Sequence, residues 1–236
     1  MIRFKIENKT YEIPTTWDEV KFLHWIQFKG KITYEQAIQI FTGIEDISNI
    51  DFTPLVPFLF WMQNDFDPNV GIVPEDFKLI KIREKEFGKK ILLHEILKEK
   101  QNKILCYPDA ISIYLCSNYD PDDIINIEDK AKEIMNWPVK KVYATGKFIM
   151  DQFDALLLVE HKTLSSGIDP NHIRAGIDIF NEFGAFCLID TMANGDITKH
   201  SEVQRIEYDK IYLKMLLNLK QTIFQKNLTK ILNPNS

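Results

Sequence analysis

Cysteine, glycine and long apolar runs are all scarce in this sequence, and each shortage argues against a class of protein. Only three cysteines occur among the 236 residues, they lie far apart, and there is no CxxC pair. An odd and widely spaced set favours neither a disulfide framework nor a zinc site. Each cysteine has apolar neighbours, among which a free thiol behaves as a small hydrophobic side chain. This usage is typical of a reducing compartment, so we expect the protein to act in a cytoplasm.

The nine glycines form no phosphate-binding motif. The sequence contains no GxGxxG, no Walker A motif and no GxSxG, which are the patterns that mark dinucleotide sites, phosphate loops and nucleophile elbows. The pair Gly146 and Lys147 lacks the upstream glycine and the following Ser or Thr of a Walker A loop, and it lies inside a helical pattern. We therefore expect no cofactor.

Metal-binding spacings and membrane-spanning runs are also missing. The acidic residues 120–123 lack the central glycine and the terminal glutamate of a calcium loop. No apolar run approaches the roughly 18 residues of a membrane-spanning helix, and the N-terminal residues alternate in polarity. We expect no metal site, no membrane span and no secretory peptide. No HExxH or paired ligand spacing occurs around the five histidines, which are His24, His94, His161, His172 and His200.

Charge is mildly acidic overall but uneven along the chain. The net charge is −5, from 29 basic and 34 acidic residues, which disfavours general nucleic-acid binding. Residues 78–103 are mainly basic and residues 120–133 mainly acidic; such runs are usually solvated faces, and complementary contact surfaces are the alternative. A DNA-binding surface is a third hypothesis, and it would use lysines 210, 214, 220, 226 and 230 of the last helix. Aromatic residues that could stack on bases do not alternate regularly with these lysines, which argues against this hypothesis.

Local patterns predict an α-rich α+β fold, with a small N-terminal hairpin or sheet followed by a multi-helix body. Ile2, Phe4 and Ile6 alternate with charged residues, and Pro14 ends the returning strand. Residues 69–82 are a second candidate strand pair. We place a boundary near residue 85, between an aromatic-rich part (1–85) and a helical part (86–236), with one continuous domain as the alternative.

Helical periodicity and capping residues mark most of the remaining chain. Thr16 with Glu19 and Thr33 with Gln36 have the spacing of capping boxes, in which the two side chains bind each other's backbone N–H groups. The predicted helices cover residues 17–28, 34–42, 53–63, 87–102, 108–117, 127–136, 138–160, 170–193 and 207–232.

The segment MANGDITKHSEV, residues 192–203, concentrates polar residues that could act in acid–base chemistry. Asp196, Lys199 and His200 are the residues that a small hydrolase or a nucleic-acid-processing enzyme would use. A helix corner explains the same residues more simply, with Asn194 or Gly195 as a left-handed cap and with Ser201 and Gln204 as a capping box. We favour the helix corner, because nothing in the sequence supplies a pocket.

Two groups of apolar residues are candidates for partner binding. Large aromatic residues crowd into the first 65 positions, where they either build the core or form an exposed contact patch. The residues in question are Trp17, Phe22, Trp25, Phe28, Phe58, Phe60 and Trp61. On the last helix, apolar residues repeat on one face, which could dock on a neighbouring protein. The candidate contact residues are Trp17, Trp25, Trp61, Tyr212, Leu216 and Leu219.

Three blocks, in the first, middle and last parts of the chain, carry a family resemblance. They are YEIPTTWDEVKFLHWIQF with IQIFTGIEDI, DAISIYLC with IINIEDKAKEIMNWPVKKVYATGKFIM, and FGAFCLIDTMANGDITKHSEVQRIEYDKIYLKMLLNLK. These blocks resemble proteins of tailed phages of Bacteroides-type hosts, and the last is also similar to baseplate-hub and tail-assembly proteins of contractile-tailed phages. The matching patterns are helix corners, so no functional residue carries over.

The resemblance implies a protein without enzymatic activity that takes part in virion assembly, either as a tail-assembly chaperone or as a small structural component. Its partners would be other phage structural proteins, and a homo-oligomer or ring is an open alternative. It would act in the host cytoplasm during assembly or stay in the virion. Neither a membrane nor nucleic acid is expected as a partner.

Overall fold

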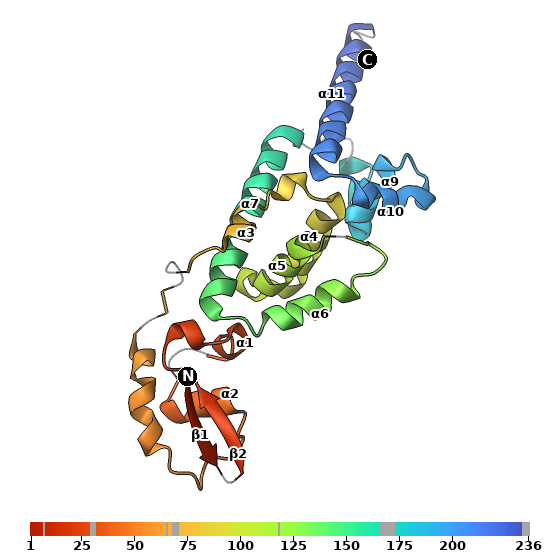
Figure 1. Cartoon of the computed structure of the whole chain (residues 1–236). Coiled ribbons are helices and arrows are strands. Elements are labelled where there is room, and N and C mark those ends of the chain that lie inside the picture. The colour runs from red at the N-terminus through yellow and green to blue at the C-terminus, as the bar shows by residue number, and fades with distance from the viewer. Residues whose placement is uncertain are drawn as a thin grey trace. The chain divides into compact units, whose positions relative to one another are not determined.

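The computed structural model describes residues 1–6, 8–28, 32–64, 66–67, 71–117, 119–165 and 173–232. These ranges are mostly helical, with one two-stranded antiparallel hairpin at the N-terminus (Figure 1), which confirms the predicted fold class. The chain forms two compact units, each built from separate segments. Unit 1 comprises Met1–Leu79, Lys100–Ser112 and Asn126–Phe148, and unit 2 comprises Ile80–Glu99, Ile113–Ile125 and Ile149–Ser236. The boundary near residue 85 stays a prediction.

The N-terminal hairpin of unit 1 follows the predicted alternation. Strands β1 (Ile2–Ile6) and β2 (Lys9–Ile13) pair with Ile2 opposite Ile13. The rings of Phe4 and Tyr11 stack at 5.8 Å, and β2 ends before Pro14, which cannot donate to a ladder.

The predicted second strand pair over residues 69–82 is wrong for its described part, from residue 71 onward. Here the chain forms two short helical turns, α3 (Glu75–Lys78) and η4 (Ile82–Glu84). The turns bury Phe77 and Ile82 without a strand partner. Pro74 precedes the first of them, and two acidic residues in its first turn favour the helix N-terminus.

The predicted helix over residues 17–28 is broken by long-range backbone pairing. A 3-10 turn η1 (Trp17–Glu19) and a short helix α1 (Phe22–Trp25) flank an extended step at Val20 and Lys21. Lys21 forms an antiparallel bridge with Pro138. The N–H of Phe22 donates to the carbonyl of Trp137 at 3.0 Å, and the N–H of Val139 donates to the carbonyl of Val20 at 2.7 Å. This pairing overrides the local helical pattern.

Only one of the two predicted capping boxes near the N-terminus forms. At the start of α2 (Tyr34–Thr42), Thr33 and Gln36 bind each other's backbone N–H groups, and Gly43 ends the helix at a φ of 69°. Thr16 makes no side-chain cap, so the box with Glu19 is wrong. The carboxylate of Glu19 instead accepts hydrogen bonds from the N-terminal ammonium and from the N–H of Thr15. These bonds, the ammonium first, lower the pKa of Glu19.

The difference between the two threonines gives a matched test. Replacement of Thr33 by Ala should lower the free energy of unfolding by about 1 kcal/mol, because the first turn of α2 loses its cap. Replacement of Thr16 by Ala should change it by less than about 0.5 kcal/mol, since that side chain is exposed and caps nothing. Urea unfolding of both variants measures the difference, and equal losses would contradict the role assigned to Thr33.

Most of the other predicted helices are confirmed, with ends shifted by a few residues. Residues 53–63 form a helix of the 3-10 type with Pro54 at its start. Inside the longest helix, Gly146 packs directly against the ring of Tyr107, where a β-carbon would clash, so close packing explains this glycine. The confirmed elements are η2 (Thr53–Gln63), α4 (Phe87–Lys100), α5 (Tyr107–Leu115), α6 (Ile125–Ile134), α7 (Val139–Leu164) and α11 (Tyr208–Leu232); a short 3-10 turn, η5 (Lys103–Cys106), precedes α5.

Unit 2 contains a second backbone bridge of the same kind as the one in unit 1. Glu86 pairs with Glu207 immediately before α4 and α11 begin. The N–H of Phe87 donates to the carbonyl of Ile206 at 2.7 Å, and the N–H of Tyr208 donates to the carbonyl of Lys85 at 2.8 Å. The two helix starts thus satisfy each other's first N–H groups.

The predicted helix over residues 170–193 is wrong as a single element. Residues 170–172 lie outside the described ranges, and the rest forms η6 (Ile177–Phe183) and α9 (Ala185–Met192). Gly184 separates them with φ 47° and ψ −124°, a backbone conformation that interrupts a helix. In the parts of the chain that the structure describes, no helix combines the length and the apolar character needed to cross a membrane.

Candidate functional site

The front aromatic residues form a connected cluster within unit 1. Trp17 lies edge-on to Trp61 at 4.9 Å and packs against Phe66 at 5.3 Å, and Trp25 lies 5.5 Å from the same Phe66 ring. The indole N–H of Trp17 donates to the carbonyl of Asn64, and that of Trp61 donates to the carbonyl of Pro14. The three half-buried tryptophans therefore hold the short elements of unit 1 together, and their role in partner binding stays a prediction.

The 192–203 corner separates its polar residues into two pairs. Asp196 and Lys199 form an exposed ion pair at 3.1 Å. The pKa of Asp196 is lowered, mainly by a hydrogen bond from the side chain of Thr198 and then by Lys199. His200 turns toward α9 instead, where its Nε2 lies 3.1 Å from Asp190 and its ring meets Phe186 edge-on at 5.0 Å. The hydrolase alternative would require the three residues to converge on one pocket.

The capping residues of the same corner are partly as predicted. Asn194 and Gly195 both have positive φ, at 55° and 76°, and the side chain of Asp196 caps the 3-10 turn η7 (Ile197–Lys199). The predicted capping box of Ser201 and Gln204 is wrong, because α10 (His200–Arg205) begins one residue before Ser201.

The acidic stretch near residue 120 binds this corner through side chains. The hydroxyl of Ser201 donates to the carboxylate of Asp122 at 3.0 Å, and Arg205 pairs with Asp120 at 2.8 Å. The pKa of Asp120 is lowered first by the N–H of Asp122 and then by Arg205. Asp120 and Asp122 therefore make contacts within unit 2.

One buried charged group of unit 2 lies at the start of α4. Lys89 is 1% exposed; its Nζ lies 3.0 Å from a carboxylate oxygen of Glu86 and donates to the carbonyl of Cys116. Burial, followed by the charge of Glu86, raises the pKa of the neighbouring Tyr119 to about 12 and also raises that of Tyr114. The charges of Lys89 and Glu86 neutralise each other inside unit 2, and the pair holds the start of α4 in position.

A second polar group anchors the first turns of α11. The hydroxyl of Tyr208 donates to Glu160 at 2.9 Å, and Lys90 pairs with the other oxygen of Glu160 at 3.1 Å. The hydroxyls of Tyr212 and Thr163 lie 2.9 Å apart. Burial, followed by the charge of Glu160, raises the pKa of Tyr208. Tyr212, one of the predicted contact residues, is thus buried within unit 2.

Exposed apolar side chains are concentrated in the C-terminal segment of unit 2. Of the 25 large hydrophobic side chains that are exposed in the described residues, fifteen lie between Ile173 and Leu232. Phe180, Phe183 and Phe186 are 55%, 49% and 47% exposed. Apolar exposure on this scale is typical of a protein-contact surface. We call Phe180, Phe183 and Phe186 the phenylalanine patch.

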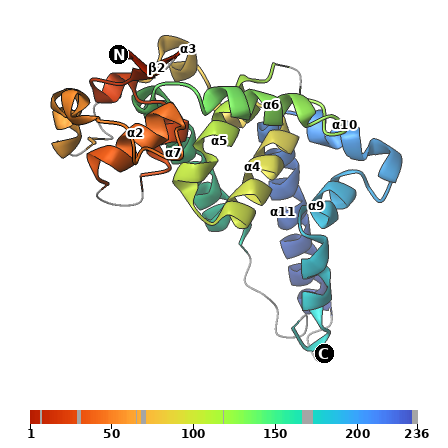
Figure 2. The same cartoon turned by 90° about the horizontal axis from the view of Figure 1, so that it is seen from below.

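Helix α11 has a buried base and an exposed distal part. Figures 1 and 2 show α9 and α10 beside its first turns, where residues of the three helices line a hollow of about 620 Å³. Leu216 and Leu219, both predicted contact residues, are half-buried, and every residue from 221 to 232 is exposed.

Sequence reasoning missed an apolar stripe on α11. The missed residues are Leu213, Leu217, Phe224, Leu228 and Ile231, all of them exposed. Their spacings of four, seven, four and three residues follow a heptad-like pattern that was readable in the sequence. The prediction chose the other stripe, which begins at Tyr212 and faces the unit.

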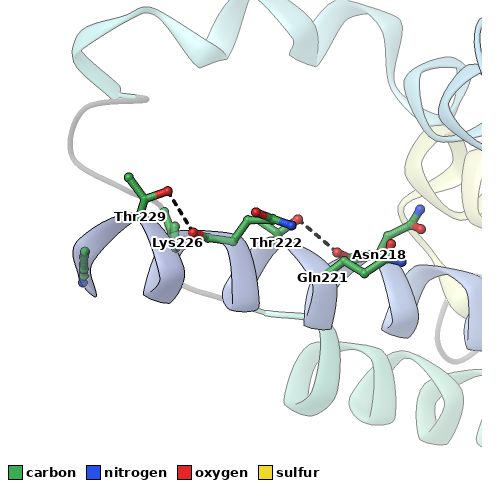
Figure 3. A pocket seen from close by; sticks show the side chains of 7 residues that line it. Asn218, Gln221, Thr222, Lys226 and Thr229 are labelled. Carbon is green, nitrogen blue, oxygen red and sulfur yellow. Dashed lines mark hydrogen bonds between the residues drawn. The ribbon is translucent and has the colours of Figure 1, made fainter. Parts of the chain in front are cut away.

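Another side of α11 is polar, and Lys226 and Lys230 are its charged residues. Figure 3 shows its side chains around a shallow hollow of about 710 Å³, lined by residues that include Asn218, Gln221 and Gln225. The hydroxyls of Thr222 and Thr229 donate to backbone carbonyls one turn earlier, at 3.0 and 2.9 Å. Amides and hydroxyls thus dominate this side.

The comparisons with known proteins add no relative: the chain matches no protein-family model, no curated protein and no solved structure. Within the described residues, no group of three or more His, Cys, Asp or Glu side chains is placed to hold a metal ion. His172 lies outside those residues.

Two histidines with lowered pKa should make stability depend on pH. Burial, followed by nearby lysines, lowers the pKa of His24 and of His94 below the usual 6.5. The unfolded chain then takes up protons before the folded one, so the free energy of unfolding should fall as the pH drops below about 6.5.

Urea unfolding between pH 7.5 and pH 5.5 measures this effect. Replacement of His94 by Gln should reduce the slope, whereas the same change at the exposed His161 should leave it as in the wild type. An unchanged slope in the His94 variant would show that this histidine titrates alike in both states.

Proposed function

We propose that this protein is a non-enzymatic assembly or structural component of a tailed-phage virion, and that it acts through protein–protein contacts made by unit 2. The observation that carries the proposal is the concentration of exposed apolar side chains between Ile173 and Leu232. Apolar surface of this extent is costly to leave in water, and burial against a partner recovers about 25 cal/mol for each Å². The resemblance of the three sequence blocks to phage proteins supplies the biological setting.

The arrangement of the chemically capable residues supports a binding role over the hydrolase alternative. Asp196 and Lys199 pair with each other, while His200 pairs with Asp190, so these groups form a folded corner. The charged groups around Lys89 and Glu160 neutralise each other within unit 2.

Two versions of the proposal differ in the fate of the protein. A chaperone binds its client during assembly in the host cytoplasm and leaves, whereas a structural component stays in the particle, alone or in a ring. Mass spectrometry of purified virions with a copy number per particle separates the two. Many copies would identify a structural component, and absence from virions with abundance in infected lysate would identify a chaperone.

The contact surface itself can be tested in the phage that encodes the protein. The double replacement of Phe180 and Phe183 by Asp should lower incorporation into particles, or recovery of the client, at least tenfold, because interface anchors of this kind contribute about 2 kcal/mol or more. A matched control places Asp at both Ile72 and Leu79, which are 81% and 82% exposed in unit 1. Equal behaviour of the two variants would rule out the phenylalanine patch as the contact surface.

A further inference from the structure

We propose that the distal part of α11, residues 213–232, binds an acidic amphipathic helix of another protein. This part is called the α11 tail below. The inference rests on the proposed function, since it assigns a kind of partner to the exposed surface of unit 2. Three observations carry it: an anchored base, an exposed apolar stripe, and a charge of one sign along the whole tail.

The base of α11 holds the tail in a fixed direction within unit 2. Tyr208 is 1% exposed and is bound both through its backbone to Lys85 and through its hydroxyl to Glu160. Ile211 and Tyr212 are also buried. Because the helix is held at its first turns, the stripe that follows is presented on a preorganised element, which lowers the entropy cost of binding.

The exposed stripe has the spacing that a partner helix requires. Leu213, Leu217 and Phe224 are 62%, 51% and 61% exposed, and Leu228 and Ile231 extend the stripe to 37% and 74%. Apolar residues spaced by three, four and seven positions form one continuous seam along a helix. A second helix with its own apolar seam fits this geometry along the length of the tail.

The lysines of α11 favour a partner helix with negative charge. From residue 210 to residue 232 the helix carries five lysines and no acidic residue. The net charge of −5 for the whole chain therefore combines +5 from these lysines with −10 from the remainder. At about 100° per residue, Lys214 and Lys220 border the stripe on its two sides, where they would meet the flanking residues of a docked helix. Asp or Glu at those flanks completes the pairing.

The same features argue against three other occupants. Two tails docked seam to seam would bring lysines together, which disfavours self-pairing. A helix that lies on a lipid surface has a polar face rich in basic residues, whereas here Lys226 and Lys230 share that face with five amide and hydroxyl side chains. Nucleic acid would use the lysines but would leave the apolar stripe uncovered.

Two synthetic helical peptides and the full-length protein provide the test. Both peptides have the same Leu and Ile seam, and they differ only in having Glu or Lys at the flanking positions. We expect the Glu peptide to bind at least tenfold more tightly than the Lys peptide in a fluorescence anisotropy titration. Higher salt should weaken the binding of the Glu peptide, because the flanking pairs are exposed.

Variants at exposed positions locate the binding without disturbing the fold. The double replacement of Leu217 and Phe224 by Asp should weaken binding of the Glu peptide at least tenfold. Replacement of Lys220 by Glu should reduce the preference for the Glu peptide. The control, a double replacement of Thr222 and Thr229 by Asp, adds the same two negative charges on the polar side. It should change affinity less than threefold, and circular dichroism should show equal helicity.

Several results would overturn the inference. These are equal affinity for the two peptides, a dimer in sedimentation velocity that Leu217→Asp dissociates, and tail-dependent binding to phosphatidylserine vesicles or to single-stranded DNA. The proposed function would fail separately, through the phenylalanine patch. If the Phe180 and Phe183 variant loses incorporation while no Glu peptide binds, the function stands and only the partner chemistry is wrong.

Discussion

In each unit, two helices begin at a shared point where their backbones pair, and the surrounding structure depends on this pairing. The first N–H groups of a helix have no acceptor within the helix, and a buried N–H without a partner costs about 1–3 kcal/mol. In unit 1 the starts of α1 and α7 supply carbonyls to each other, and in unit 2 the starts of α4 and α11 do the same. The first side chain of each helix is almost fully buried: Phe22, Val139, Phe87 and Tyr208 are 0%, 0%, 0% and 1% exposed. The backbone pairing thus caps the helices and places their first side chains in the core.

The bridge in unit 2 also determines which part of α11 is exposed. Since Tyr208 is fixed at the bridge, the first turns of α11 pack into the unit and the distal turns are left exposed. The ion pair of Lys90 with Glu160 strengthens the same attachment, because Glu160 also accepts from Tyr208. In the proposed binding role, a partner would supply the apolar surface that the fold itself does not place against the distal turns.

The elements that the sequence predicted correctly are those with local causes. The hairpin depends on alternation, the start of α2 on Thr33 and Gln36, and the long helices on periodicity. The wrong predictions arise from contacts between residues far apart in the sequence. Val20 and Lys21 are extended because they pair with residues at the start of α7, and Glu19 binds the N-terminal ammonium instead of capping a helix. For the candidate site, periodicity identified α11 but not which of its two apolar stripes would face the core. That choice depends on the position of Tyr208, which the bridge and the hydrogen bond to Glu160 fix.

The exposed apolar stripe of α11 leaves stabilisation unrealised in the fold. Full burial of a side chain such as Leu, Ile or Phe stabilises a protein by about 1.5–3 kcal/mol, and the fold forgoes most of this at Leu213, Leu217, Phe224 and Ile231. Such a stripe also risks association between copies of the chain. The lysines that border it counter this risk, because like charges disfavour the pairing of two tails. The same lysines would attract acidic flanks, so one set of charges can keep identical tails apart and favour a different partner.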